Sequence, residues 1–367
     1  MTESKAHLRE TARFRWGTVM THLWLRAEQR PNEERTGLMP DGAAALIAAG
    51  VRVTVERSSV RAVPLEDYVA AGCAIAPENA WPAAPRDAII FGLKELPEDG
   101  TPLIHRHIMF GHAYKGQSAG KVLLRRFRAG GGTLYDLEYL VDKGGRRVAA
   151  FGYWAGYAGA AVALKCLAAQ RDGIAGPVAR YPGRQALLDD LARDMAGMDR
   201  PRVIVIGALG RVGTGASDLC TAMGIPVTKW DMAETASGGP FPQVLQHDIF
   251  LNCILARPGC PVFVPRSALT DPRALRVIGD IACDPTSDFS PIKVYDRATD
   301  WDAPALRVAT DPVLDVTAID NLPSLLPVES SEDYAAQLLP TLLSLPAIDA
   351  GVWGRAKATF DTHIRDL

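Results

Sequence analysis

The chain has 367 residues, of which 48% are hydrophobic and 22% charged, and its net charge is −2. This length exceeds one typical domain and suits two, each large enough to bury a core without disulfides or metals. The net charge is close to zero, and the sequence contains no run of five or more like charges. Both features argue against a nucleic-acid or anionic-membrane partner and favour a small-molecule ligand.

No segment approaches the roughly 18 uninterrupted apolar residues of a membrane span, and the charged N-terminus does not resemble an export signal. The six cysteines are scattered without C-x-x-C spacing, at positions 73, 166, 220, 253, 260 and 283. That pattern is typical of reduced thiols and gives no metal site. The C-terminal R-D-L is not the peroxisomal S-K-L address. We therefore expect a soluble, cytoplasmic protein without a metal.

The first third of the chain alternates short apolar runs with a helical segment. We expect strands at His22–Leu25, Val51–Glu56 and Ala88–Leu93, and a helix at Asp41–Ala49. This alternation is typical of βαβ units and therefore of an α/β layer. Asp41 is a candidate N-cap for the helix, and Gly50 suits the left-handed position at its end.

The middle of the chain contains the expected crossing to a second lobe. A strand-like run at 144–157 passes into the small-residue helical stretch A-G-A-A-V-A-L-K-C-L. A helix is expected at 183–199. Apolar runs typical of a buried parallel sheet follow at 202–206, 225–230, 248–255 and 274–283, which predicts a Rossmann fold.

Two amphipathic helical segments after about Ser330 are expected to return to the first lobe. The predicted organisation is therefore two Rossmann-like α/β domains with parallel sheets, separated by a cleft. Residues 1–150 plus 331–367 would form the N-terminal domain and residues 151–330 the Rossmann domain.

A glycine-rich turn follows the strand at 202–206. Gly207, Gly210 and Gly213 are spaced G-x-x-G-x-x-G, which alone is weak evidence, but a helix can begin at Arg211. Glycines let a backbone approach a pyrophosphate, and a helix N-terminus offers N–H groups to its charge. Asp231 ends the next strand, near the offset of a ribose-binding acid, and its carboxylate would repel a 2′-phosphate. NAD is therefore the expected cofactor, although a glycine turn that binds nothing remains the alternative.

The proposed chemistry lies in residues 89–117. Lys94 follows a buried strand, where partial desolvation would bring an amine toward neutral pH so that it can act as a base. A surface lysine paired with Glu95 or Glu98 is the structural alternative. His112 titrates near pH 7, but His105 and His107 are rivals, and sequence spacing cannot choose among the three.

The chain also resembles a known family over nearly its whole length and in order. The matching words are L-W-L-R-A-E (23–28), G-L-K-E-L-P-E (92–98), H-I-M-F-G-H-A-Y-K-G-Q (107–117), G-T-L-Y-D-L-E (132–138), G-R-R-V-A-A-F-G (145–152), G-A-L-G-R-V-G-T-G-A (207–216), K-W-D-M-A-E-T (229–235), G-G-P-F (238–241) and D-N-L-P-S-L-L-P (320–327). They resemble those of the NAD-dependent, lysine-forming saccharopine dehydrogenases. The resemblance implies an alanine dehydrogenase-like fold and the reversible conversion of saccharopine, NAD and water to L-lysine, 2-oxoglutarate and NADH.

The resemblance also implies roles for individual residues. Lys94 matches the base that takes a proton from the secondary amine, and His112 matches the acid–base for imine hydrolysis. The implied substrate-binding residues are Arg26, Gln117, Arg147, Phe151, Ala282, Cys283 and Asp284. The implied cofactor-binding residues are Arg146, Gly207, Gly210, Arg211, Gly213, Asp231, Thr235, Ile281, Ile319, Asp320, Asn321 and Leu322. Lys115 is near enough in sequence to His112 to tune its charge state.

Three residues depart from the family pattern. Gly120 stands where the family often has tryptophan, Ser237 stands where arginine is expected, and Cys283 falls in a small-residue stretch near the substrate. Two alternatives therefore remain at this stage: an opine-type dehydrogenase that joins another amine to a 2-oxo acid, and a catalytically silent NAD-binding regulatory protein. The expected partners are small-molecule substrates, with no nucleic acid and no membrane; a monomer is plausible.

Overall fold

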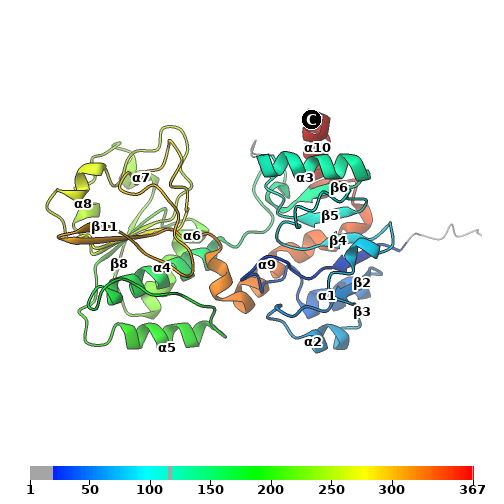
Figure 1. Cartoon of the computed structure of the whole chain (residues 1–367), viewed down its shortest axis with the longest axis horizontal. Helices are drawn as coiled ribbons and strands as arrows, with labels where there is room; N and C mark the ends of the chain where they lie inside the picture. The colour runs from blue at the N-terminus through cyan, green and yellow to red at the C-terminus, as the bar shows by residue number, and fades with distance from the viewer. Residues whose placement is uncertain (1–19, 115–117, 366) are drawn as a thin grey trace, which may run out of the picture.

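The computed structural model describes residues 20–114, 118–365 and 367, and it divides into two lobes (Figure 1). Each lobe contains one six-stranded sheet. The first lobe contains strands β1 to β6, and the second contains β7 to β12, as the colour progression shows. This is the α/β architecture expected from the alternation of apolar runs.

The first sheet is entirely parallel, in the order β3-β2-β1-β4-β5-β6. Its strands are β1 (His22–Leu25), β2 (Arg52–Glu56), β3 (Ala74–Ala76), β4 (Ile89–Phe91), β5 (Arg106–Met109) and β6 (Thr133–Asp136). Successive side chains of a strand point to opposite faces. Ile89 and Phe91 accordingly join one core cluster, and Ile90 joins another.

Helices cover both faces of the first sheet. They are α1 (Pro40–Ala48), α2 (Leu65–Ala70), α3 (Ser118–Gly130), α9 (Pro327–Leu342) and α10 (Gly351–Arg365), with short 3-10 turns η1 (Trp81–Ala83), η2 (Leu137–Tyr139) and η5 (Leu345–Ala347). Tyr334 of α9 and Trp353 of α10 are buried in the same cluster as Phe91. The two C-terminal helices therefore pack on the first sheet, where α10 lies against β6 and α3.

The second sheet has the order β11-β12-β10-β9-β7-β8, parallel except for the antiparallel pair β11 and β12. Its strands are β7 (Val203–Ile206), β8 (Val227–Trp230), β9 (Ile249–Asn252), β10 (Val277–Asp280), β11 (Leu306–Thr310) and β12 (Val313–Thr317). Its helices and turns are α4 (Gly152–Ala169), α5 (Arg184–Asp194), α6 (Arg211–Ala222), α7 (Met232–Thr235), α8 (Pro242–Leu245), η3 (Arg266–Leu269) and η4 (Leu322–Leu325).

Helices α4 and α6 cross at backbone contact on this sheet. A Cβ on Gly156 of α4 would lie 1.8 Å from the carbonyl oxygen of Val212, and a Cβ on Gly215 of α6 would lie 1.9 Å from that of Tyr153. Only glycine fits at either position. The small-residue stretch therefore serves close helix packing, and it fixes α6 against α4.

Two local predictions were wrong. The first helix begins at Pro40 with Met39 as its N-cap, because proline's fixed φ and missing N–H suit the first helical position; the carboxylate of Asp41 instead accepts from Gly42 N–H at 2.8 Å. Residues 144–151 form a loop, not a strand, with one isolated bridge between Val141 and Arg147. Gly50 does adopt the left-handed conformation, at φ 84°.

We propose the domain division 1–150 plus 331–367 and 151–330. The chain passes from the first sheet to the second between β6 and α4. The boundary at 330/331 falls inside α9, whose first turn follows the second lobe and whose later residues, such as Leu338, are buried under the first sheet.

Candidate active site

Lys94 lies just beyond β4, at the edge where the parallel strands of the first sheet end. The carboxylate of Glu28 accepts hydrogen bonds from the backbone N–H groups of Leu93 (2.6 Å) and Lys94 (3.0 Å). Arg26 donates to the carbonyl oxygen of Lys94. These contacts fix the backbone of Lys94, so the end of β4 and the two side chains that follow β1 set the position of the amine.

The environment of Lys94 favours a neutral amine. The side chain is 9% exposed. Burial lowers the pKa of Lys94, the positive charge of Arg35 lowers it further, and Glu33 and Asp320 oppose the shift. A lysine whose pKa is lowered in this way can accept a proton nearer to neutral pH.

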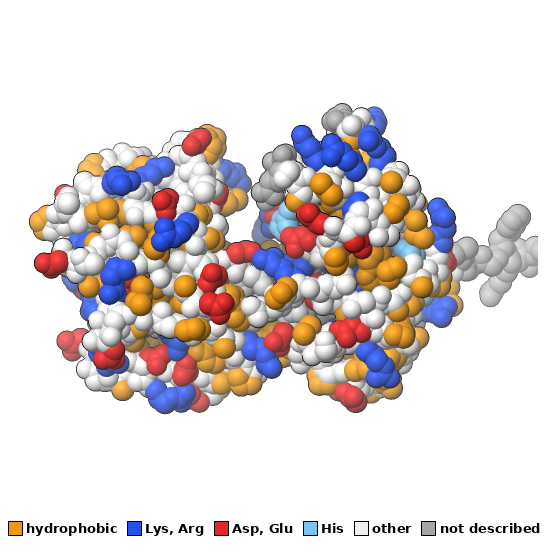
Figure 2. All heavy atoms as spheres, viewed as in Figure 1, with side chains coloured by type: hydrophobic (Ala, Val, Ile, Leu, Met, Phe, Trp, Pro, Cys, Tyr) orange, Lys and Arg blue, Asp and Glu red, His pale blue; other side chains and the backbone are white. Residues whose placement is uncertain are grey.

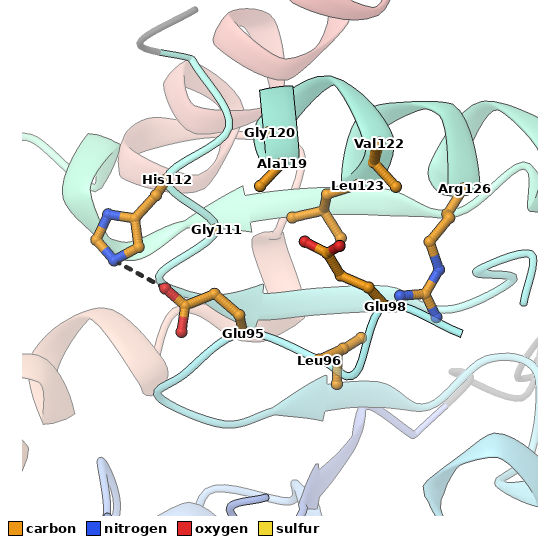
Figure 3. A pocket seen from close by; sticks show the side chains of 10 residues that line it. All are labelled: Glu95, Leu96, Glu98, Gly111, His112, Ala119, Gly120, Val122, Leu123 and Arg126. Atoms are coloured by element: carbon orange, nitrogen blue, oxygen red, sulfur yellow. Dashed lines mark ion pairs between the residues drawn. The ribbon is translucent and has the colours of Figure 1, made fainter. Parts of the chain in front are cut away.

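His112 lies beyond β5, at the same edge of the sheet, between two carboxylates. Its Nε2 is 3.4 Å from Glu95 Oε1, the ion pair drawn in Figure 3, and its Nδ1 is 3.6 Å from Glu138 Oε2. The side-chain interaction with Glu138 is the largest cause that raises the pKa of His112, and Glu95 adds to it against partial burial. The residue adopts φ 47° and its ring stacks on Phe110. His112 is therefore held between two carboxylates that stabilise its protonated form.

The rival histidines are core residues. His105 and His107 are each 1% exposed, and His107 packs edge-on against Trp81 and Phe127. Burial lowers the pKa of His107 well below its ordinary value. Neither residue lines the cleft that contains Lys94 and His112.

A cleft of about 560 Å³ between the lobes is lined by Lys94, His112 and ten more of the predicted site residues. The predicted residues in its lining are Lys94, His112, Arg147, Phe151, Arg211, Ile281, Ala282, Cys283, Ile319, Asp320, Asn321 and Leu322. Figure 2 shows charged side chains of both signs at the narrowing between the lobes. One cavity therefore joins the acid–base pair to the loops that follow β10 and β12.

Arg26, a predicted substrate-binding residue, lies outside the lining of the cleft. It is 1% exposed, its guanidinium contacts the carbonyls of Ala27 and Lys94, and it lies 3.4 Å from Glu28. Its place in the fold is beneath Lys94, not in the cleft lining. The exposed Arg146 and Asp284 are also outside that lining, and Gln117 lies outside the described residues.

Arg35 is a cleft residue that sequence reasoning missed. It is 3% exposed, pairs with Glu33 at 2.6 Å, lies 4.2 Å above the ring of Phe151, and donates to the side chain of Asn321 in the second lobe. Nothing in its sequence neighbourhood distinguishes it from the adjacent charged residues. Glu138, which pairs with Arg147 at 2.9 Å, was also missed as a functional group, although it lies within the G-T-L-Y-D-L-E word.

The glycine turn lies at the carboxyl end of β7, in the second lobe. Gly207 adopts φ 86°, and a Cβ on Gly213 would lie 2.1 Å from Gly207 O. Gly210 is the N-cap of α6 and supplies no side-chain cap, so the first N–H groups of that helix are available to an anion. The close backbone approach and the uncapped helix fit the pyrophosphate of NAD.

Asp231 borders this turn at the end of β8. Its Oδ2 accepts from Leu209 N–H at 3.0 Å and its Oδ1 from Met232 N–H at 2.9 Å. Thr235 donates back to the carbonyl of Asp231 at 2.9 Å. The acid is therefore held beside the glycine turn, which is where a ribose hydroxyl would lie next to a bound pyrophosphate.

Within the described residues, no helix is long and apolar enough to cross a membrane.

The chain resembles curated proteins along nearly its whole length. It is 46% identical to "Saccharopine dehydrogenase [NAD(+), L-lysine-forming]" of Schizosaccharomyces pombe, over 95% of this chain and all of that protein. The identity is also 46% to the protein of the same name from Yarrowia lipolytica, over 95% and 98%. The family model for the alanine dehydrogenase/PNT N-terminal domain matches residues 24–158.

The fold resembles solved structures at lower sequence identity. An L-alanine dehydrogenase superposes with a TM-score of 0.65 and 17% identity, covering 93% of this chain and 94% of that one. At that identity the similarity concerns the fold, which is the two-domain arrangement expected from the sequence.

Proposed function

Because the chain belongs to the family of NAD-dependent, L-lysine-forming saccharopine dehydrogenases, we propose that Lys94 and His112 carry the proton transfers of its reaction. The protein is an oxidoreductase acting on a CH–NH group: it catalyses the reversible NAD-dependent oxidative deamination of saccharopine to L-lysine and 2-oxoglutarate. The observation that carries the proposal is that both side chains line one cleft and that their surroundings shift the two pKa values in opposite directions.

Lys94 acts as the base toward the secondary amine of saccharopine. The nitrogen lone pair must be free before the adjacent α-carbon can lose hydride, so a base has to remove the ammonium proton first. The lowered pKa of Lys94 makes its neutral amine accessible for that step. Bound NAD would supply the hydride acceptor for this carbon, so that the C–N bond of the substrate becomes an imine.

His112 acts in the hydrolysis of the imine. Water must add to the imine carbon, and the resulting carbinolamine must lose lysine as its nitrogen is protonated. The neighbouring carboxylates raise the pKa of His112 while burial lowers the pKa of Lys94, so the two shifts favour a protonated imidazole and a neutral amine, which suit opposite roles. Glu138 and Glu95 hold the imidazole on either side and compensate its charge.

Cations in the cleft suit a substrate with three carboxylates. Arg147 is 45% exposed and remains accessible while it pairs with Glu138. Arg35 and Arg211 also line the cleft. A guanidinium can bind a carboxylate through two parallel hydrogen bonds, which would orient the α-carbon toward the cofactor. We assign Phe151, Ala282 and Cys283 to the walls of the same subsite.

The NAD subsite would run from the glycine turn to the cleft. Gly207, Gly210, Arg211 and Gly213 would hold the pyrophosphate, and Asp231 with Thr235 the adenosine ribose. Ile281, Ile319, Asp320, Asn321 and Leu322 would lie beside the nicotinamide, because they line the cleft that contains Lys94. We also propose a cytoplasmic location, since all six cysteines are free thiols.

The test is oxidation of NADH, followed by absorbance, with 2-oxoglutarate and a panel of amines that includes L-lysine. We expect turnover with a clear preference for lysine; preference for another amine would contradict the substrate assignment. Lys94→Met and His112→Gln should each lose about 10²-fold to 10⁴-fold in kcat while still binding NADH. The matched controls are Lys121→Met and His247→Gln, which lie outside the cleft lining.

A further inference from the structure

A second cavity adjoins the interdomain cleft inside the first lobe. Its volume is about 160 Å³, and it lies between the segment after β4 and the first turns of α3 (Figure 3). The lining residues are Glu95, Leu96, Glu98, Gly111, His112, Ala119, Gly120, Val122, Leu123 and Arg126. His112 lines this cavity and also the cleft, so the two spaces meet at the proposed acid–base residue.

The cavity exists because α3 begins with residues that have little or no side chain. Gly120 packs directly on the backbone of the segment that follows His112: a Cβ there would lie 2.8 Å from the Cα of Ala113. Ala119 contributes only a methyl group toward the space seen in Figure 3. The helix can therefore approach His112 closely without filling the hollow beside it.

The walls of the cavity combine apolar surface with the carboxylates of Glu95 and Glu98 and the guanidinium of Arg126. Leu96 and Leu123 are buried, and Val122 is 37% exposed at the outer rim. Glu98 has no ion pair or hydrogen bond among the described residues, whereas Glu95 is already shared between His112 and Arg30. The guanidinium of Arg126 is 5% exposed.

The three hydrogen bonds of Arg126 do not use all the N–H groups of its guanidinium. Its three nitrogens donate to Thr101 O (2.8 Å), Pro97 O (2.6 Å) and Asp99 Oδ1 (2.7 Å). A guanidinium has five N–H groups, so some are not used by these contacts. The same contacts hold the segment that bears Glu98. In Figure 3 the guanidinium of Arg126 lies at the side of the cavity away from His112, and the carboxylate of Glu98 is seen between the two.

We propose that this cavity binds the amino-acid end of the amine substrate, that is, the α-ammonium and α-carboxylate of lysine. The inference rests on the proposed function. The reacting nitrogen must lie beside Lys94 and His112, and four methylene groups separate it from the α-carbon. Leu96, Leu123 and Val122 would contact the methylenes, Glu98 the ammonium, and Arg126 the carboxylate.

The size of the cavity agrees with this occupant. An apolar cavity of about 150 Å³ holds a benzene molecule. A space of about 160 Å³ therefore accommodates a short methylene chain with part of a small polar head, but not an aromatic amino acid as well. Lysine should be preferred over amines that lack either charge at the far end, namely cadaverine, 6-aminohexanoate and pentylamine.

The decisive variants change the cavity without touching Lys94 or His112. Val122→Phe places a ring at the rim, and we expect the KM for lysine to rise about tenfold or more while the KM for 2-oxoglutarate stays unchanged. Glu98→Gln should raise the KM about tenfold for lysine and cadaverine but leave that for 6-aminohexanoate nearly unchanged, because only the first two carry the ammonium. Lys121→Phe and Glu66→Gln are the matched controls.

The outcomes separate this inference from the proposed function. If the wild-type protein does not oxidise NADH with lysine and 2-oxoglutarate, the proposed function is wrong. If it does, and both Val122→Phe and Glu98→Gln keep the wild-type KM for lysine, the subsite is wrong while the reaction stands. Should Val122→Phe fail to fold, Glu98→Gln at the exposed rim decides the question, since equal effects on all four amines would also overturn the proposal.

Discussion

Gly213→Ala tests the assignment of the glycine turn as the NAD site. The added Cβ would lie 2.5 Å from the Cα of Ala208 and 2.1 Å from Gly207 O, and the second distance is 1.3 Å short of the 3.4 Å at which ordinary contact begins. Gly207 cannot yield easily, because its N–H donates to Trp230 O at 2.9 Å and its carbonyl accepts from Gly210 N–H at 3.2 Å. The turn or α6 must therefore shift by about 1 Å.

A displacement of that size should be costly for the cofactor. Misplacing a binding group by about 1 Å can lose on the order of 10²-fold, which corresponds to about 2.7 kcal/mol of binding free energy. At an NAD concentration 100 times the wild-type Kd, the cofactor should stabilise the wild-type protein by about 2.7 kcal/mol and the variant by only about 0.4 kcal/mol. Overpacking itself should cost about 1–3 kcal/mol of stability.

The assay is calorimetric titration with NAD, combined with thermal unfolding with and without it. Gly176→Ala is the control, because a Cβ at Gly176 meets no atom within 4 Å. If Gly213→Ala binds NAD with the wild-type Kd and keeps the full ligand-induced stabilisation, the pyrophosphate does not lie on this turn.

Three further outcomes follow from the charged groups. Glu138→Gln removes the largest cause of the raised pKa of His112, so the ionisation of this group in the pH–rate profile should move to lower pH; an unmoved profile would contradict the acid–base role. Burial lowers the pKa of His107 below its ordinary 6.5, so the unfolded chain binds the proton more readily, and stability present above about pH 6.5 should be lost as the pH falls. The stability of His107→Phe, followed by circular dichroism during acid titration, should depend less on pH over that range than the stability of the wild-type protein. An unchanged slope of stability against pH would be inconsistent with a neutral buried ring. Arg35→Ala leaves Glu33, 0% exposed, without its main partner and should lower the free energy of unfolding by about 3–5 kcal/mol in urea titrations, whereas a loss under 1 kcal/mol would show that the pair contributes little.

The sequence predicted those elements whose conformation is decided by the residues of one short segment. Buried apolar runs predicted strands that are present, such as Val203–Ile206, and the strand followed by glycines predicted the turn before α6. Gly50 was identified because few residues adopt φ 84°. These predictions succeed because the cause is local to the segment.

Predictions failed where a side-chain hydrogen bond, and not the apolar pattern, decides the local conformation or the burial of a residue. The run at 144–157 has strand-like composition, but Asp142 accepts from the N–H groups of Gly144 and Arg146 and closes a turn there. The burial of Arg26 depends on a carbonyl 68 residues away, and that of Arg35 on Asn321 in the other lobe. No periodicity in the chain carries such information, so the choice among arginines required the fold.

The crossing of α4 and α6 limits how the cofactor preference of this protein could be redesigned. Helix α6 presents its uncapped N-terminus at the turn, while its Gly215 touches the backbone of α4, whose first residues line the cleft. Substitutions within α6 that shift the glycine turn would therefore also displace the first residues of α4, which line the cleft. A library aimed at a phosphorylated dinucleotide should instead vary the exposed rim at Met232 and Ser237 together with Asp231, leaving both helices untouched.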